Sequence, residues 1–314
     1  MAGSTSVVVA ALISNAAIAV LKFVAFLLTG SPSMLSETYH SISDTGNQIF
    51  LLIGIRYSDK NPTADHPFGY GKAQFFYSFL VSVLLFGIAG WESLRHGYDA
   101  LMHGGEALSP GAVTVAGTSF DAVWVSVAVL AGAICFEGYA FRKAFGELRH
   151  QMNEYGWSGF VEAFHATSDV TTLTAFTEDS VALSGAFLAL AGIGLSRLTG
   201  NPAYDAAGAM LIGVLLMTFA VALAWENKRL LLGESVPRRL ESDFETIIRS
   251  HPGIVHVDRF RTMFVGPDDI LIAADVSFDP DLDTADIDGD ITHIEEKLRE
   301  RDERVRFVYV EPEL

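Results

Sequence analysis

Apolar residues gather in long runs over the first three quarters of the chain. Each run holds about 20 residues or more, enough for a helix to cross the roughly 30 Å of hydrocarbon in a bilayer. The six runs are residues 6–29, 34–55, 75–98, 122–146, 168–195 and 204–226. This pattern predicts an all-α bundle of six transmembrane helices and excludes a water-soluble enzyme.

The residues after the sixth run alternate as in a small soluble domain. The expected elements are a helix, two strands, a helix and a strand, over residues 238–251, 254–264, 269–278, 284–303 and 305–311. This order suits an α+β domain of the ferredoxin-like or metallochaperone-like kind, with both helices on one face of a short sheet. We therefore expect a membrane domain over residues 1–232 and a second domain over residues 233–314.

Lysine and arginine residues are divided unevenly between the two ends of the predicted helices. Ten lie in the connections after the second, fourth and sixth runs, and the opposite side has only Arg95 and Arg197. Because cytoplasmic loops carry the excess of basic residues, we expect both termini in the cytoplasm. The sequence thus predicts a multi-pass protein of the cell membrane with a cytoplasmic tail.

Composition narrows the choice of partners. Half of the residues are apolar, 19% are charged, and the formal net charge is −17. Such an acidic chain offers no basic surface for nucleic acid. The single cysteine, Cys135, excludes a disulfide framework and a cysteine-based zinc site. No nucleotide-binding fingerprint, intramembrane protease motif or nucleophile motif occurs, so we do not expect an enzyme.

Ionisable residues inside the apolar runs carry the candidate chemistry, because a charged side chain at the centre of a bilayer costs about 2.5–3.5 kcal/mol to insert. In the second run, His40 and Asp44 are four residues apart and therefore share one face of a helix. An imidazole nitrogen and a carboxylate oxygen are ligands that zinc favours. The alternative interpretation is a hydrogen-bonded pair that only joins helices.

A tetrahedral zinc site needs ligands from another helix, and the fifth run offers two competing pairs. His165 and Asp169 repeat the spacing of four residues, whereas Glu178 and Asp179 are adjacent. Asp179 lies about 24 Å from the outer end of its helix, within reach of the pair in the second run, while His165 falls at or beyond the cytoplasmic surface. We expect Asp179 as a ligand and the other pair at the cytoplasmic mouth. Glu178 is a fourth ligand, a proton-carrying neighbour or a residue that only pairs with another helix.

Taken together, these features resemble the cation diffusion facilitator family. The resemblance covers essentially the whole chain, and the acidic fifth run is similar to the branch that contains the mitochondrial zinc transporter. The segments that carry it are His40-x-x-x-Asp44, Ser31-Pro32-Ser33, His66-Pro67-Phe68-Gly69-Tyr70-Gly71-Lys72 and Glu178-Asp179-Ser180.

The resemblance implies a homodimeric antiporter that exports divalent metal cations in exchange for protons, with a tail for dimerisation and regulation. Its partners are then the metal ion, protons, the lipid bilayer and a second copy of the chain. Ala175 stands where many relatives carry a histidine, so Glu178, Asn47 or a water would complete the ligand set. Zinc is the expected ion, and manganese, iron(II) or cobalt would suit this harder set as well. A metal-sensing scaffold that does not transport is the alternative function.

The resemblance also raises a second zinc site in the loop before the third run. There only His66 matches the family, with Asp65 nearby, while Thr63 stands at the position of its aspartate and Tyr70 at that of its second histidine. We therefore expect a packed loop turned at Gly69 rather than a second site.

An acidic run over residues 279–290 spans the start of the second helix of the tail. Its glycine is misplaced for a calcium-binding EF-hand loop, and the closing glutamate is missing. We expect this run to cap the N-terminus of the helix, where carboxylates interact favourably with the helix dipole.

Overall fold

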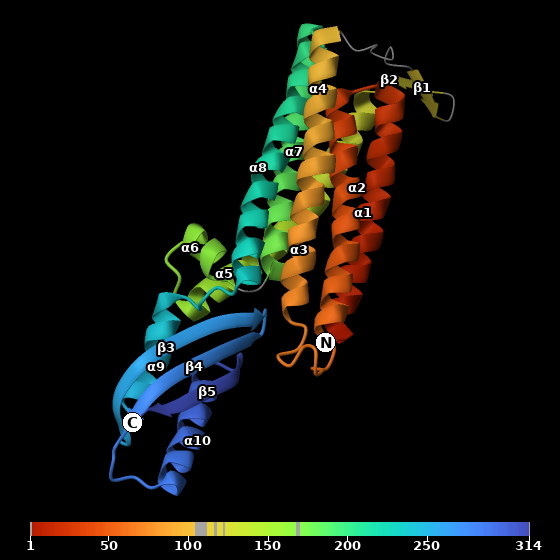
Figure 1. Cartoon of the computed structure of the whole chain (residues 1–314). Coiled ribbons are helices and arrows are strands. Elements are labelled where there is room, and N and C mark those ends of the chain that lie inside the picture. Colours follow the sequence, from red (N-terminus) through yellow and green to blue (C-terminus); the bar gives the residue numbers. More distant parts are fainter. Residues whose placement is uncertain (1, 104–111, 116–117, 122, 168–169, 314) are drawn as a thin grey trace. The chain divides into compact units, whose positions relative to one another are not determined.

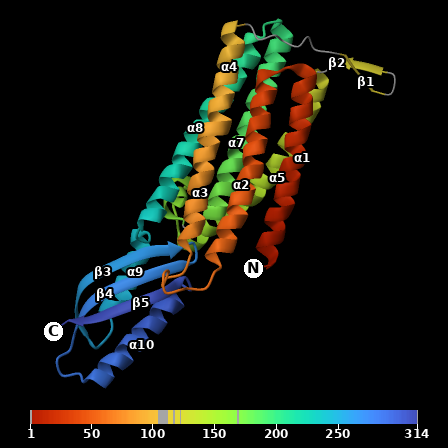
Figure 2. The same cartoon turned by 45° about the vertical axis from the view of Figure 1, so that its right-hand side comes forward.

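The computed structural model describes the chain except residues 1, 104–111, 116–117, 122, 168–169 and 314 (Figures 1 and 2). The chain packs as two compact units. The helical unit comprises residues 1–54, 77–163 and 171–226, and the tail unit comprises residues 55–76, 164–170 and 227–314. Each unit is described by itself.

Long helices occupy the six predicted runs, which confirms the expected helical class. The helices before the tail are α1 (Ala2–Thr29), α2 (Pro32–Ser58), α3 (Lys72–Leu84), α4 (Trp91–His103), α5 (Val123–Tyr155), α6 (Phe160–Ala166), α7 (Val170–Thr199) and α8 (Ala203–Leu232). A π-helical turn, Leu85–Gly90, joins α3 to α4, so the third run forms one continuous helix. The short helix α6 and a two-stranded antiparallel ladder, β1 (Ala112–Val115) with β2 (Thr118–Asp121), were not expected.

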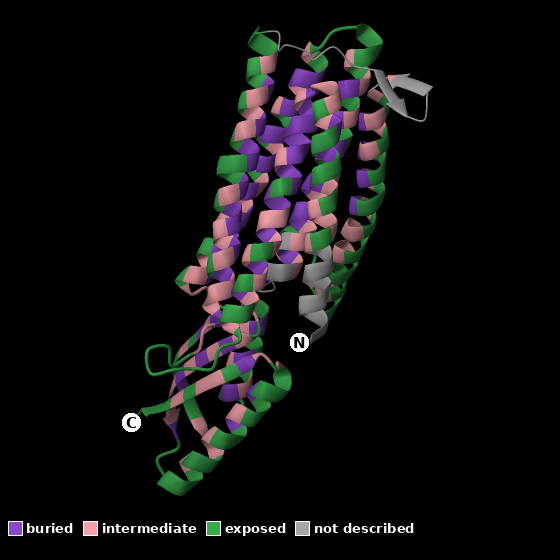
Figure 3. Ribbon diagram, turned by 90° about the vertical axis from the view of Figure 1, so that its right-hand side faces the viewer, coloured by how far each residue is buried: buried purple, intermediate pink, exposed green. Residues whose placement is uncertain are grey.

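Five helices in the described part of the chain are long and apolar enough to cross a membrane, and α2 is not among them. Its 27 residues nevertheless extend about 40 Å. Polar side chains of α2 are buried, whereas Ile42, Ile49 and Ile53 are exposed. Figure 3 shows buried residues along the inner faces of the bundle helices and exposed residues along their outer faces. This arrangement, apolar outside and polar inside, is the reverse of a helix in water and suits a lipid environment.

The turn between α1 and α2 follows from its sequence. Gly30 has a φ of +66°, a conformation that glycine adopts without steric cost. The Ser31 hydroxyl accepts a hydrogen bond from the Met34 amide, which satisfies a free N–H at the start of α2. Pro32 takes the first helical position, where no N–H is needed. These three residues together end α1 and start α2 within a tight turn.

Small and aliphatic side chains fill the centre of the helical unit. The buried members of this core are Ala25, Met34, Leu85, Ala89, Leu130, Val181, Ala186, Ala189, Ile193, Ile212, Leu216 and Ala220. Glycines bring α4 and α8 close together, since a Cβ on Gly213 would lie 2.6 Å from the backbone nitrogen of Leu94. Small residues at such crossings allow the backbone contact that holds membrane helices together.

The tail contains the predicted order of elements. They are α9 (Arg238–Arg249), β3 (Ile254–Gly266), β4 (Asp269–Phe278), α10 (Thr284–Arg301) and β5 (Val305–Glu313). The central strand, β4, runs antiparallel to β3 and parallel to β5. Every second residue of β4 is buried, so one face of the sheet meets the core, to which α9 and α10 contribute Phe244, Ile248, Ile294 and Leu298.

The acidic run before α10 forms a helix cap, as predicted. The Asp283 carboxylate accepts hydrogen bonds from the backbone amides of Ala285 and Asp286. The Asp286 side chain in turn accepts from the Asp283 amide, which completes a capping box.

The connection between α2 and α3 packs on the tail sheet within the tail unit. Phe75 is fully buried in the tail core, and the ring of Phe68 lies edge-on to Phe307 at a centroid distance of 5.4 Å. Gly71 approaches β3 so closely that a Cβ there would lie 2.6 Å from the Val265 carbonyl oxygen. Residues 55–76 therefore belong structurally with the tail strands, a contact that no local pattern indicated.

Candidate functional site

Charged and amide side chains meet in the middle of the helical unit. This interior cluster consists of Lys22 from α1, Glu37, His40, Asp44 and Asn47 from α2, Glu137 from α5, and Glu178 and Asp179 from α7. Apart from Asp179, which is half-buried, each is at most 7% exposed. Steps of three and four residues place the four α2 members on one face of the helix.

The structure brings the expected site residues together in pairs. His40 Nε2 lies 3.4 Å from Asp44 Oδ2, as the spacing of four residues predicts. Asn47 Nδ2 donates a hydrogen bond of 2.8 Å to Glu178 Oε1, which joins α2 to α7. Asp44 also interacts electrostatically with Glu178 and Asp179. With Lys22 from α1 and Glu137 from α5, side chains of four helices therefore form a strongly acidic interior.

Several ligand-type atoms of the interior cluster have no hydrogen-bond partner among the described residues. They are Glu37 Oε1, both ring nitrogens of His40, Asp44 Oδ1 and Asn47 Oδ1. Buried polar atoms are nearly always paired, so unsatisfied oxygen and nitrogen atoms in one place are typical of a cation site. In the described residues, however, no three His, Cys, Asp or Glu side chains are arranged to hold a metal ion. The potential ligand atoms therefore lie in one region of the described helical unit, but they do not surround a common point.

Three members of the interior cluster were missed in the sequence. Lys22 donates a hydrogen bond of 2.7 Å to Glu37 Oε2, and both side chains are fully buried. Glu137 lies near enough to interact electrostatically with both. The available signal was that each of these charged residues lies inside an apolar run, where a charge is costly: Lys22 in the first run, Glu37 in the second and Glu137 in the fourth. This signal does not predict which residues they pair with, because those partners are distant in the chain.

The accessory residues lie elsewhere. Asp169 falls outside the described residues, as does the side chain of His165, so the structure does not place this competing pair. His66 and Asp65 lie in an exposed loop, where the His66 ring stacks on Tyr70 at 4.3 Å. The φ of +82° at Gly69 confirms the expected turn, but the loop is exposed over residues 61–68 rather than packed throughout.

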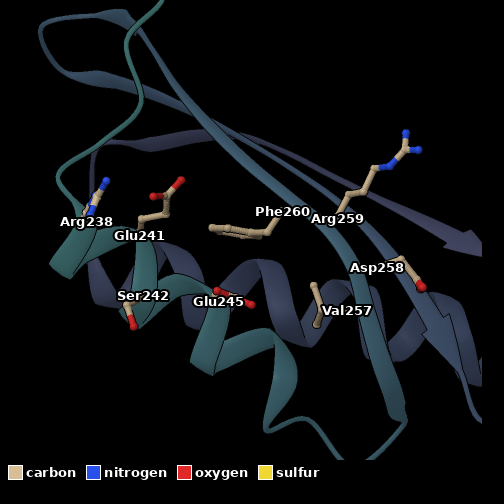
Figure 4. A pocket seen from close by; sticks show the side chains of 8 residues that line it. All are labelled: Arg238, Glu241, Ser242, Glu245, Val257, Asp258, Arg259 and Phe260. Atoms are coloured by element: carbon tan, nitrogen blue, oxygen red, sulfur yellow. The ribbon is translucent and has the colours of Figure 1, made fainter.

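A hollow of about 480 Å³ lies between α9 and β3 of the tail. Its lining residues are Arg238, Glu241, Ser242, Glu245, Val257, Asp258, Arg259 and Phe260. In Figure 4, Phe260 extends from β3 towards α9, whereas Arg259 points away from that helix. The Asp258 carboxylate accepts a hydrogen bond of 2.7 Å from the Ser277 hydroxyl. With charges of both signs and an acid that is already paired, this hollow is a weaker candidate than the interior cluster.

Two protein families match the chain, one in each part. The family described as the cation efflux transmembrane domain matches residues 8–232. The family described as the cation efflux protein cytoplasmic domain matches residues 236–313. Together they cover both the helical region that holds the interior cluster and the α+β tail.

Individual relatives agree with this assignment. The chain is 29% identical to the mitochondrial proton-coupled zinc antiporter SLC30A9 of Mus musculus, over 88% of this chain and 46% of the relative. It is 26% identical to metal tolerance protein C4 of Arabidopsis thaliana, over 88% of this chain and 57% of the relative. It is 25% identical to the cation-efflux pump FieF of Klebsiella pneumoniae, over 82% of this chain and 76% of the relative. The chain spans about half the length of the first two.

The helices, the buried acidic interior and the small α+β tail all agree with the matched families. Because the transmembrane family alone matches more than half of the chain, this protein belongs to the cation efflux, or cation diffusion facilitator, family of multi-pass membrane proteins.

Proposed function

We propose that this chain exports divalent metal cations across a membrane in exchange for protons. One observation carries the proposal: the interior of the helical unit holds far more carboxylates than cations. Glu37, Asp44, Glu137 and Glu178 are buried there, and Lys22 is the only buried lysine or arginine in the described part of the chain. The names of the relatives, a proton-coupled zinc antiporter and a cation-efflux pump, support the same activity.

The charge imbalance indicates how exchange would work. An ionised carboxylate away from water is strongly disfavoured unless a cation or a proton neutralises it. One lysine cannot balance the interior cluster, so either protons or a metal ion must supply the remaining positive charge. A site that holds one or the other, but not both, couples the two flows. Metal binding then releases protons, because ligands must be deprotonated to coordinate.

The proposed ligands are His40, Asp44, Asp179 and Glu178. The free oxygen of Asn47 is available as a further donor in place of the histidine that Ala175 replaces. A metal ion would draw these side chains together from α2 and α7, since its positive charge would offset the repulsion between their carboxylates. Rocking of the helices would then expose the ion to the other side, where protons displace it. Zinc suits an imidazole with carboxylates best, and manganese, iron(II) and cobalt suit it less well.

Orientation and assembly are part of the proposal. The ten basic residues on one side support our proposal that both termini lie in the cytoplasm, and we propose the cell membrane as the location of the chain. The tail belongs to a family described as a cytoplasmic domain, which supports its position on that side. A homodimer joined through the tail is also part of the proposal, because the family that matches residues 236–313 is named for a dimer.

Metal-driven proton flux in liposomes tests the proposal. The protein would be reconstituted into liposomes that contain a pH-sensitive dye and a metal-sensitive dye. Zinc, manganese, iron(II) or cobalt would then be added in turn under an inward or outward proton gradient. We expect zinc to drive proton movement, and Asp44→Asn and Asp179→Asn to reduce it at least tenfold without loss of insertion or dimerisation. Asp258→Asn, which removes an acid on the tail surface, is the matched control.

Two results would overturn the assignment. Wild-type flux in both Asp44→Asn and Asp179→Asn would show that the interior cluster is not the transport site. Loss of zinc binding in Asp169→Asn, with binding retained in Asp179→Asn, would instead favour the pair His165 and Asp169.

A further inference from the structure

The Lys22–Glu37 pair is the one fully buried ion pair of the described helical unit. The two side chains have no exposed surface, and their charged atoms are 2.7 Å apart. Burying two charges costs more than their attraction usually returns, so such a pair is weak as a stabilising device. An ionisable residue at this depth in a membrane helix is a functional candidate by default.

Glu37 occupies a specific position relative to the proposed ligands. It precedes His40 by three residues and therefore lies one turn away on the same face of α2. Its Oε2 accepts from Lys22, while its Oε1 has no hydrogen-bond partner. On the α7 side, Oε1 lies so close to Gly185 that a Cβ there would overlap it. The missing side chain at residue 185 is what makes room for the carboxylate between α1 and α7.

Lys22 faces the acidic side of the cluster as well. Besides Glu37, it interacts electrostatically with Glu137 and Asp44. Without its ammonium group, Glu37 would become an unpaired carboxylate next to the proposed ligands. A divalent cation would be the nearest available counter-ion for it.

We propose that Lys22 is a tethered cation that keeps Glu37 out of the metal ligand set and thereby limits how tightly the site holds its ion. The inference rests on the proposed transport function and names a positioning residue for it. A transport site must bind the ion and also release it, so the surplus negative charge has to be held within limits. The ammonium group of Lys22, held against Glu37, sets that limit.

Two isosteric variants should shift metal affinity in opposite directions. Lys22→Met frees the Glu37 carboxylate, so we expect zinc to bind at least tenfold more tightly and to turn over more slowly. Glu37→Gln leaves the ammonium group facing the remaining carboxylates, so we expect zinc to bind at least tenfold more weakly. The double variant Lys22→Met with Glu37→Gln removes one charge of each sign and should bind zinc as the wild type does.

The measurement is zinc titration by calorimetry on the full chain in lipid nanodiscs, together with KM and maximal rate of zinc flux in liposomes. Lys143→Met, which removes an exposed lysine from α5, is the matched control and should leave both unchanged. If Lys22→Met alone does not fold, the other two variants still test the inference. Glu37→Gln should then have a weakened zinc affinity, and the double variant should have a restored one.

The outcomes separate this inference from the proposed function. If both single variants bind zinc as the wild type does, or both shift in the same direction, Lys22 does not have this role. A pair that is only structural would lower the yield of both single variants without moving their zinc affinity, which also refutes it. Wild-type zinc affinity in Asp44→Asn, measured alongside, would instead refute the proposed ligand set.

Discussion

Gly185→Ala offers the most direct test of how tightly α7 is fitted to the interior cluster. The added Cβ would fall well inside van der Waals contact of Glu37 Oε1, and it would lie 3.6 Å from Glu37 Cδ. The end of a glutamate side chain can normally move aside, but here Lys22 holds the carboxylate at 2.7 Å in a fully buried place. The substitution must therefore either disturb the ion pair or push α7 away from α2.

The cost follows from the packing. Inserting a methyl group into a filled interior destabilises by about 1–3 kcal/mol. Alanine also gains about 1 kcal/mol over glycine in a helix, which partly masks that cost. Gly194→Ala on the same helix provides the matched control, because a Cβ there meets nothing within 4 Å. Both variants gain the same helix propensity, so this gain cancels when they are compared. The remaining difference in their free energy of unfolding, about 1–3 kcal/mol, measures the steric overlap at residue 185 alone.

Thermal unfolding of both variants in detergent, followed by zinc flux in liposomes, is the assay. At about 2–4 °C for each kcal/mol in a domain of this size, Gly185→Ala should unfold roughly 2–12 °C below Gly194→Ala. We also expect lower zinc flux in Gly185→Ala only. Equal unfolding temperatures and equal flux in the two variants would refute the close contact between Gly185 and Glu37.

Two further predictions concern the start of α2 and the tail. Asp205→Ala should destabilise the helical unit by about 1–2 kcal/mol in thermal unfolding, because Asp205 Oδ1 accepts from the Ser33 amide at 3.3 Å near the start of α2. Asp205→Asn, which keeps an acceptor oxygen, should stay close to the wild type, and an equal loss in both would contradict this cap. Burial lowers the pKa of His251 below its usual 6.5, against the opposing charge of Asp290. The unfolded chain then binds more protons than the folded one below about pH 6.5, so the tail should lose stability as the pH falls through that region. This loss can be measured by hydrogen exchange of β4 amides, corrected for intrinsic rates. It should appear in the wild type and in the control His256→Asn but not in His251→Asn. If the stability of His251→Asn depends on pH as in the wild type, His251 is excluded as the source.

The sequence alone was sufficient for features that depend on neighbours along the chain. Long apolar runs predicted the helices, and the turn at Gly30 and the cap at Asp283 follow from the conformational preferences of a few adjacent residues. The contact of His40 with Asp44 is of the same kind, since a spacing of four residues places two side chains on one face of any helix.

Short elements were harder to find. The strands β1 and β2 have four residues each, and α6 has seven. Such segments are too short for a hydrophobic period to repeat, so their pattern does not stand out from a loop. The π-helical turn Leu85–Gly90 was hidden for a different reason, because it lies inside a continuous helix and changes only the hydrogen-bond spacing.

The tertiary structure alone decided which distant residues became partners. Lys22 pairs with Glu37, Asn47 pairs with Glu178, and the loop holding Phe68 packs on β5 of the tail. Periodicity states which face of a helix is polar, but it does not state which other helix that face meets. That choice depends on how side chains fill space across the whole interior, where a missing side chain at Gly185 makes room for a buried carboxylate.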